Sequence, residues 1–194
     1  MPVCRCAMTS KSAYDLSRLK LLIVDDDQHM QTLLRTIVRG IGIENVKFED
    51  KPAHVLAAIA TFNPDIMLLD LQMPETDGLE LARHIRRDEK SPNPYLPMIA
   101  VSAAADRTHV TAARDAGINE FLAKPLSAAS VYDRIVSIIE KPRPFVRNSA
   151  YAGPCRRRLK KLIYRGVEQR SAAGKTLAQA VAKAHREDGK GAAP

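Results

Sequence analysis

The sequence has no tryptophan and few other aromatic residues, four phenylalanines and five tyrosines among 194 residues. A buried core must therefore be built mostly from aliphatic side chains. Apolar residues make up 45% of the chain and charged residues 27%, which is ordinary for a globular protein. This length allows one well-buried domain together with a substantial appendage.

Long apolar runs are also missing. No segment approaches the roughly 20 consecutive apolar residues that a membrane-spanning helix requires. The first twelve residues, MPVCRCAMTSKS, carry charge and lack the apolar centre of a secretory signal. We therefore expect no membrane span and a cytoplasmic location.

Cysteine is scarce as well. Cys4, Cys6 and Cys155 are too few and too scattered for a disulfide framework. Cys4 and Cys6 could supply half of a metal site, but no matching His or Cys pair follows at zinc-finger spacing. Free thiols are the simpler interpretation.

Acidic residues are nearly absent from the C-terminal quarter. Residues 1–140 hold 16 Lys and Arg against 19 Asp and Glu, whereas residues 141–194 hold 14 against 3. The chain is therefore a mildly acidic body followed by a strongly basic tail. Such a tail suits a nucleic acid or an anionic membrane surface, and it is equally compatible with a solvated, partly helical extension.

Short apolar runs alternate with helical periodicity along the body. The runs predict five strands, at 21–24, 45–48, 65–69, 98–101 and 120–123. Stretches with apolar residues at i, i+3 and i+4 lie between them and predict helices. This alternation is typical of a doubly wound α/β fold with a five-stranded parallel sheet.

The end of this pattern divides the chain. A last helix is expected from about Ser127, a plausible N-cap, until Pro142 and Pro144 stop it. We predict an N-terminal extension over 1–18, a folded domain over 19–141 and a basic extension over 142–194. Residues 141–155 are rich in Pro and Gly and indicate a linker or an extended arm. The remainder has too few large apolar residues for a standard DNA-binding core.

Polar residues follow four of the predicted strands. Asp25-Asp26-Asp27 follow the first strand, Asp70 the third, Ser102 the fourth and Lys124-Pro125 the fifth. Because the carboxyl ends of parallel strands meet at one edge of a sheet, we expect these side chains to converge. Neighbouring carboxylates repel one another unless a cation lies among them, and oxygen ligands favour Mg²⁺. A hydroxyl and an ammonium are donors suited to a phosphoryl group.

The segments IVDDDQHM, DIMLLDLQMPETDGLEL, MIAVSA and EFLAKPL together resemble the signature segments of response-regulator receiver domains, CheY-like proteins with a flavodoxin-like fold. The resemblance covers about residues 19–141. It implies that Asp70 accepts a phosphoryl group, that Lys124 binds this group and that Ser102 follows it. The implied Mg²⁺ ligands are Asp25, Asp26, Asp70 and the backbone carbonyl of Gln72.

The resemblance also implies a switch and a cis peptide bond before Pro125. When Asp70 is phosphorylated, Ser102 moves inward and an aromatic residue on the fifth strand, here Phe121, turns into the interior. Phe121 lacks the hydroxyl of the commoner Tyr, so the buried rotamer could also form without phosphate. A static core role for Phe121 is the alternative.

Function is thus expected to be that of a stand-alone response regulator and not of an enzyme, although the domain promotes its own phosphorylation and dephosphorylation. A histidine kinase or histidine phosphotransfer protein would supply the phosphoryl group, and an output protein would bind the phosphorylated form. A nucleic-acid-associated regulator that uses the basic tail is the alternative. A hydrolase is disfavoured, because phosphoaspartyl hydrolases carry a second Asp where this chain has Gln72.

Overall fold

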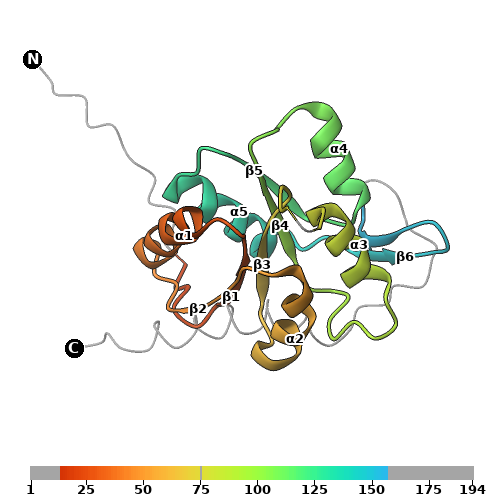
Figure 1. Cartoon of the computed structure of the whole chain (residues 1–194), viewed down its shortest axis with the longest axis horizontal. Coiled ribbons are helices and arrows are strands. Elements are labelled where there is room, and N and C mark those ends of the chain that lie inside the picture. The colour runs from red at the N-terminus through yellow and green to blue at the C-terminus, as the bar shows by residue number, and fades with distance from the viewer. Residues whose placement is uncertain (1–13, 75, 157–194) are drawn as a thin grey trace, which may run out of the picture.

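The computed structural model describes residues 14–74 and 76–156. The expectations for Cys4 and Cys6 and for a partly helical tail beyond residue 156 lie outside these ranges. Within them, a five-stranded parallel sheet has the strand order β2-β1-β3-β4-β5. Its strands are β1 Lys20–Val24, β2 Asn45–Glu49, β3 Ile66–Asp70, β4 Met98–Ser102 and β5 Glu120–Ala123 (Figure 1).

Five helices cover the two faces of this sheet in the described part of the chain. They are α1 Gln28–Gly40, α2 Pro52–Phe62, α3 Gly78–Arg87, α4 Arg107–Asp115 and α5 Ala128–Glu140. α1 and α5 pack on one face, and α2, α3 and α4 pack on the other. The doubly wound, flavodoxin-like fold that the sequence predicts is confirmed.

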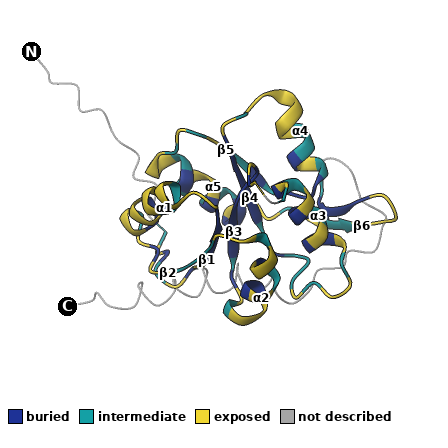
Figure 2. Ribbon diagram, in the orientation of Figure 1, coloured by how far each residue is buried: buried dark blue, intermediate teal, exposed yellow. Residues whose placement is uncertain are grey.

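Aliphatic side chains fill both layers, as the shortage of aromatic residues required. Every residue of β3 and β4 is buried, because helices cover both faces of these central strands. Ile59 and Ile85 belong to one core layer, and Leu34 and Ile135 to the other. Figure 2 shows this buried centre flanked by helices whose outer sides are exposed.

Local capping explains where several helices begin. The side chains of Asp27, Asp77 and Asp106 each accept a hydrogen bond from a backbone N–H in the first turn of α1, α3 and α4. Ser127 caps α5 through a reciprocal capping box with Ser130. The expected N-cap Ser127 is thus confirmed.

The segment after α5 differs from the expected linker. Strands β6 Phe145–Arg147 and β7 Ala152–Pro154 pair as an antiparallel hairpin, which lies beside α3 in Figure 1. The Phe145 ring meets the Tyr95 ring edge-on, with 4.7 Å between centroids. A Cβ on Gly153 would lie 2.6 Å from Cα of Gly117, so the two backbones are in direct contact. Packing on the body, which a local Pro and Gly count does not register, orders this segment.

A buried arginine holds the loops beneath the hairpin. The side chain of Arg86, 1% exposed, donates hydrogen bonds to the backbone carbonyls of Pro94, Leu96 and Gly117 and to Oδ1 of Asn119. Its guanidinium also lies 5.6 Å from the centroid of the Phe145 ring. Burial lowers the pKa of Arg86 to about 9, so the group remains charged at neutral pH.

None of the helices in residues 14–74 and 76–156 is long and apolar enough to cross a membrane.

Candidate functional site

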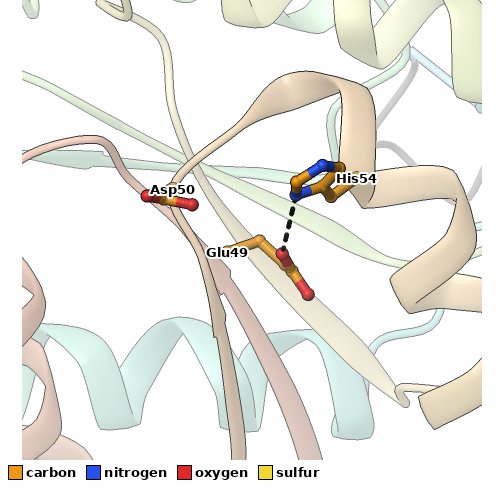
Figure 3. Close-up of side chains that lie close together, drawn as sticks. All are labelled: Glu49, Asp50 and His54. Atoms are coloured by element: carbon orange, nitrogen blue, oxygen red, sulfur yellow. Dashed lines mark ion pairs between the residues drawn. The ribbon is translucent and has the colours of Figure 1, made fainter.

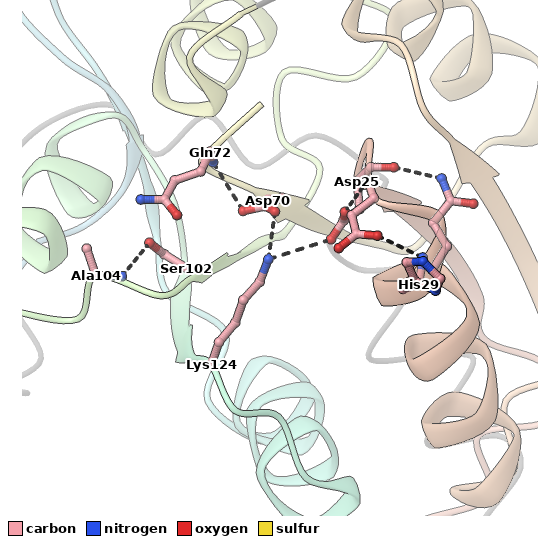
Figure 4. Close-up of polar contacts among 9 residues, drawn as sticks. Asp25, His29, Asp70, Gln72, Ser102, Ala104 and Lys124 are labelled. Carbon is pink, nitrogen blue, oxygen red and sulfur yellow. Dashed lines mark hydrogen bonds and ion pairs between the residues drawn. The ribbon is translucent and has the colours of Figure 1, made fainter. Parts of the chain in front are cut away.

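The polar residues predicted to converge do so at the carboxyl edge of the sheet (Figure 4). Asp25 directly follows β1, Asp70 ends β3 and Ser102 ends β4. Lys124 follows β5 and reaches toward both carboxylates. Four separate strand ends therefore contribute to one cluster, because the parallel topology aligns them at the same edge.

Lys124 is the cationic centre of this cluster. Its Nζ donates a hydrogen bond to Oδ2 of Asp70 at 2.8 Å and lies 4.0 Å from Oδ2 of Asp25. The lysine side chain is 21% exposed, so its ammonium lies at the rim of the site rather than beneath it. The Lys124–Pro125 peptide bond is cis, the isomer that the family resemblance implies.

Three carboxylates lie close enough to share a cation. Asp25, Asp26 and Asp70 each offer an oxygen, and these atoms lie within 4.8 Å of one another. Asp25 and Asp70 are buried, whereas Asp26 is exposed to solvent. The three residues therefore combine buried negative charge with an open side through which an ion could enter.

Asp25 has an incomplete set of hydrogen bonds. Its Oδ1 accepts a bond from the backbone N–H of Asp27 at 2.9 Å, but its buried Oδ2 accepts none from the described residues. Burial raises the pKa of Asp25 to about 6, and the negative charge of Asp70 adds to the shift against the attraction of Lys124. An unsatisfied buried carboxylate oxygen is what a hard cation would complete.

The loop after β3 shapes the surroundings of Asp70. The backbone N–H of Gln72 donates to Oδ1 of Asp70 at 3.1 Å, and Gln72 forms an isolated antiparallel bridge with Asp77. The loop then returns so closely that a Cβ on Gly78 would overlap the backbone carbonyl oxygen of Asp70. Nothing local in the sequence signals this close approach of Gly78 to Asp70, because it depends on the path of the loop.

Ser102 is buried at the end of β4, and its Oγ accepts a hydrogen bond from the backbone N–H of Ala104 at 3.2 Å. No hydrogen bond joins Ser102 to Asp70 among residues 14–74 and 76–156. Phe121 lies on β5 and is half-buried against the core layer that includes Ala113 and Ala116. Both residues implied as parts of a switch thus lie on neighbouring strands, at different levels of burial.

A second group of potential ligands lies where β2 ends. Glu49, Asp50 and His54 also bring ligand atoms within 4.8 Å of one another. Figure 3 shows these three side chains close together. Nδ1 of His54 lies 4.0 Å from Glu49 Oε2, and Lys47 binds the other Glu49 oxygen at 3.2 Å. Asp50 and His54 are exposed, and Lys47 already neutralises Glu49. The sequence did not single out this group, and its charges are largely compensated by ordinary ion pairs.

The cluster around Asp70 suits Mg²⁺ better than a transition metal. Among the described residues, its side-chain donors are all carboxylate oxygens, without sulfur or imidazole, and this donor set is typical of hard divalent ions. The orphaned Oδ2 of Asp25 and the exposed carboxylate of Asp26 suit an ion that retains some of its water.

Comparison with known proteins agrees with the fold. The family model described as the response regulator receiver domain matches residues 21–136. The chain is 32% identical over 123 residues to the chemotaxis protein CheY of Pseudomonas aeruginosa, covering 63% of this chain and 98% of that protein. It is 30% identical to chemotaxis protein CheY-3 of Vibrio cholerae, covering 63% and 93%.

Solved structures show the same similarity. The signal receiver domain of a response regulator from Bermanella marisrubri is 29% identical, with a TM-score of 0.55 and coverage of 62% of this chain and 97% of that one. Chemotaxis protein CheY4 of Vibrio cholerae, 18% identical with a TM-score of 0.56, shares the fold and covers 62% and 98%. The β6–β7 hairpin lies beyond the residues that the family model matches. The chain therefore belongs to the response regulator receiver domain family, the CheY-like phosphoacceptors of two-component signalling.

Proposed function

We propose that Asp70 accepts a phosphoryl group from a phosphohistidine of a histidine kinase or a histidine phosphotransfer protein. A carboxylate oxygen of Asp70 attacks phosphorus, the phosphorus–nitrogen bond breaks, and the imidazole leaves with the electron pair and takes up a proton. The product is an acyl phosphate on Asp70. The position of Asp70 at the end of a buried strand, with an ammonium at 2.8 Å, supports this role.

Asp25, Asp26, Asp70 and the backbone carbonyl of Gln72 would hold Mg²⁺. When bound, this ion would neutralise charge on the transferred phosphoryl oxygens. The buried Oδ2 of Asp25, which accepts no hydrogen bond from the described residues, supports this assignment.

Lys124 changes partners during the reaction that we propose. Before phosphorylation its Nζ donates to Asp70, and afterwards the phosphoryl oxygens are the stronger acceptors within reach. Ser102 follows the phosphoryl group by exchanging its bond with Ala104 for one to a phosphoryl oxygen. Phe121 is then free to pack more deeply beside Ala113, which alters the surface of α4 and β5 that an output protein would bind.

The 2.8 Å contact between Lys124 and Asp70, within a triad of carboxylates, is the observation that carries this proposal. The protein should be incubated with acetyl phosphate and Mg²⁺ and its intact mass measured before and after hydroxylamine. We expect a hydroxylamine-labile phosphoryl adduct that requires Mg²⁺ and disappears in Asp70→Asn.

Asp133→Asn is the matched control, since Asp133 is an exposed aspartate on α5 and should leave the adduct intact. An adduct that persists in Asp70→Asn, or one equally abolished by the control, would refute the assignment of Asp70.

A further inference from the structure

Arginines gather where the β6–β7 hairpin meets the C-terminal end of α3. Nη2 of Arg87 donates to the backbone carbonyl of Ala150 in the hairpin at 2.6 Å, and Nη2 of Arg147 lies 3.5 Å from the carbonyl of Arg87. Each guanidinium thus contacts the backbone of the other element, Arg87 that of the hairpin and Arg147 that of α3. Both arginines are exposed, so their remaining N–H donors face solvent.

These two positive charges are not compensated locally. Neither Arg87 nor Arg147 has a carboxylate within ion-pair distance among residues 14–74 and 76–156. The nearest acidic residue in sequence, Asp88, pairs instead with His84 at 3.1 Å. Asp88 and Glu89 follow Arg87 in the sequence, and the adjacent Lys90 offsets one of these two negative charges.

The far end of the hairpin repeats this excess of positive charge. Arg114 and Arg156 share a single carboxylate oxygen of Asp115, at 3.1 and 3.4 Å. The segment 141–156 contains four basic residues and no acidic one, and the sequence continues as Arg157-Arg158 and then Lys160-Lys161. We call Arg87, Arg147, Arg114 and Arg156 the hairpin arginines.

The hairpin arginines lie away from the phosphoacceptor site. The hairpin packs against Gly117 and Tyr95, which precede β5 and β4 and so belong to the amino edge of the parallel sheet. Asp25 and Asp70 lie at the carboxyl edge. The hairpin arginines and the phosphoacceptor site therefore lie at opposite edges of the sheet, so a ligand at one leaves the other accessible.

We propose that the hairpin arginines form a docking surface for the phosphate backbone of a duplex nucleic acid. Arginine offers a planar fork of donors that matches phosphate oxygens, and a run of phosphates can engage several such groups at once. An anionic membrane fits less well, because only one exposed large apolar residue of the described ranges, Val110, lies near these arginines, one turn before Arg114 on α4, and the other, Leu33, lies on α1. This proposal does not depend on phosphorylation of Asp70.

Fluorescence anisotropy with a labelled DNA duplex of mixed sequence tests the proposal on the full chain. The association constant should be measured between about 50 and 200 mM salt, a range over which phosphate contacts weaken steeply. Replacing Arg87→Gln together with Arg147→Gln should lower the slope of log K against log salt by about 1.8, since each lost phosphate contact removes about 0.9.

Two further pairs of substitutions distinguish an effect of charge on binding from an effect of packing. Arg18→Gln with Arg39→Gln removes two exposed arginines from the region of α1 and should leave the slope unchanged. Arg87→Lys with Arg147→Lys keeps the charge and should retain most of the slope, even if the hairpin loses the hydrogen bond that Arg87 donates to Ala150.

Three results would overturn the proposal. One is an equal slope of log K against log salt for the Arg87 and Arg147 glutamine pair and for the control pair at Arg18 and Arg39. This result would assign any binding to the tail alone. Another is a salt slope for the Arg87→Lys and Arg147→Lys pair that is as low as that of the glutamine pair, which would mean that these arginines act only on folding. The third is tighter binding to vesicles of anionic phospholipid than to the duplex at equal phosphate concentration, which would identify a membrane as the ligand.

Discussion

Replacing Asp25 by Asn should stabilise the fold in the absence of Mg²⁺. Asp25 is 1% exposed and its Oδ2 accepts no hydrogen bond from the described residues, so its ionised form is poorly solvated. The pKa of Asp25 rises from 3.8 to about 6 on folding. At about 1.4 kcal/mol per pKa unit, the ionised carboxylate costs the native state roughly 3 kcal/mol at neutral pH.

The sign of this effect determines its pH dependence. Because the pKa of Asp25 is higher in the folded state, the native protein holds a proton that the unfolded chain releases between about pH 4 and 6. The cost is therefore fully present above about pH 6 and disappears as pH falls through the folded pKa toward 3.8. Asp25→Asn should be more stable than wild type at neutral pH by roughly 3 kcal/mol, and the difference should close near pH 4.

Urea unfolding followed by circular dichroism, in chelator and over this pH range, measures the difference. Asp26→Asn is the matched control, because Asp26 is exposed and its loss should change the free energy of unfolding by less than about 0.5 kcal/mol. Adding Mg²⁺ at about 100 times its dissociation constant should stabilise wild type by about 2.7 kcal/mol and Asp25→Asn by much less. An Asp25→Asn protein that is less stable than wild type in chelator at neutral pH would show that this reasoning is wrong.

Three other substitutions test the packing that surrounds the site and the hairpin. Arg86→Met should lower the free energy of unfolding by roughly 2–4 kcal/mol in urea titrations, because it leaves buried carbonyls such as that of Leu96 without a donor. An unchanged midpoint of the urea unfolding transition would contradict this. Gly153→Ala should separate the hairpin from Gly117, because the new Cβ would clash with that backbone. Hydrogen exchange should then show faster exchange of the amide of Cys155, which donates to the carbonyl of Pro144. Protection of this amide equal to wild type would count against the contact. Gly78→Ala should slow phosphorylation by acetyl phosphate, because its Cβ overlaps the backbone of the phosphoacceptor, and a wild-type rate would exclude that constraint.

The architecture of the body and much of its acidic site were predictable from sequence, for a local reason. Strands buried on both faces appear as short apolar runs, and β3 and β4 are buried along their whole length. Parallel connectivity then brings the carboxyl ends of the strands to one edge, so Asp70 and Lys124 were expected to be neighbours before any distance was known. Capping is equally local, which explains why Ser127 was recognised as a helix start.

The features that depend on distant contacts were not predictable. The hairpin strands β6 and β7 have three residues each, too short for a periodic pattern, and packing against α3 orders them. Arg86 lies four residues after Ala82, on the same apolar face of α3. This position indicates burial, but a charged side chain is ordinarily expected to be exposed. By itself, the sequence determined the order of the elements and the chemistry at the strand ends, because both follow from local pattern and topology. Only the tertiary structure decided that Asp25 is left with an unsatisfied oxygen, and that the hairpin brings Arg87 and Arg147 together, because both depend on which distant backbones come into contact.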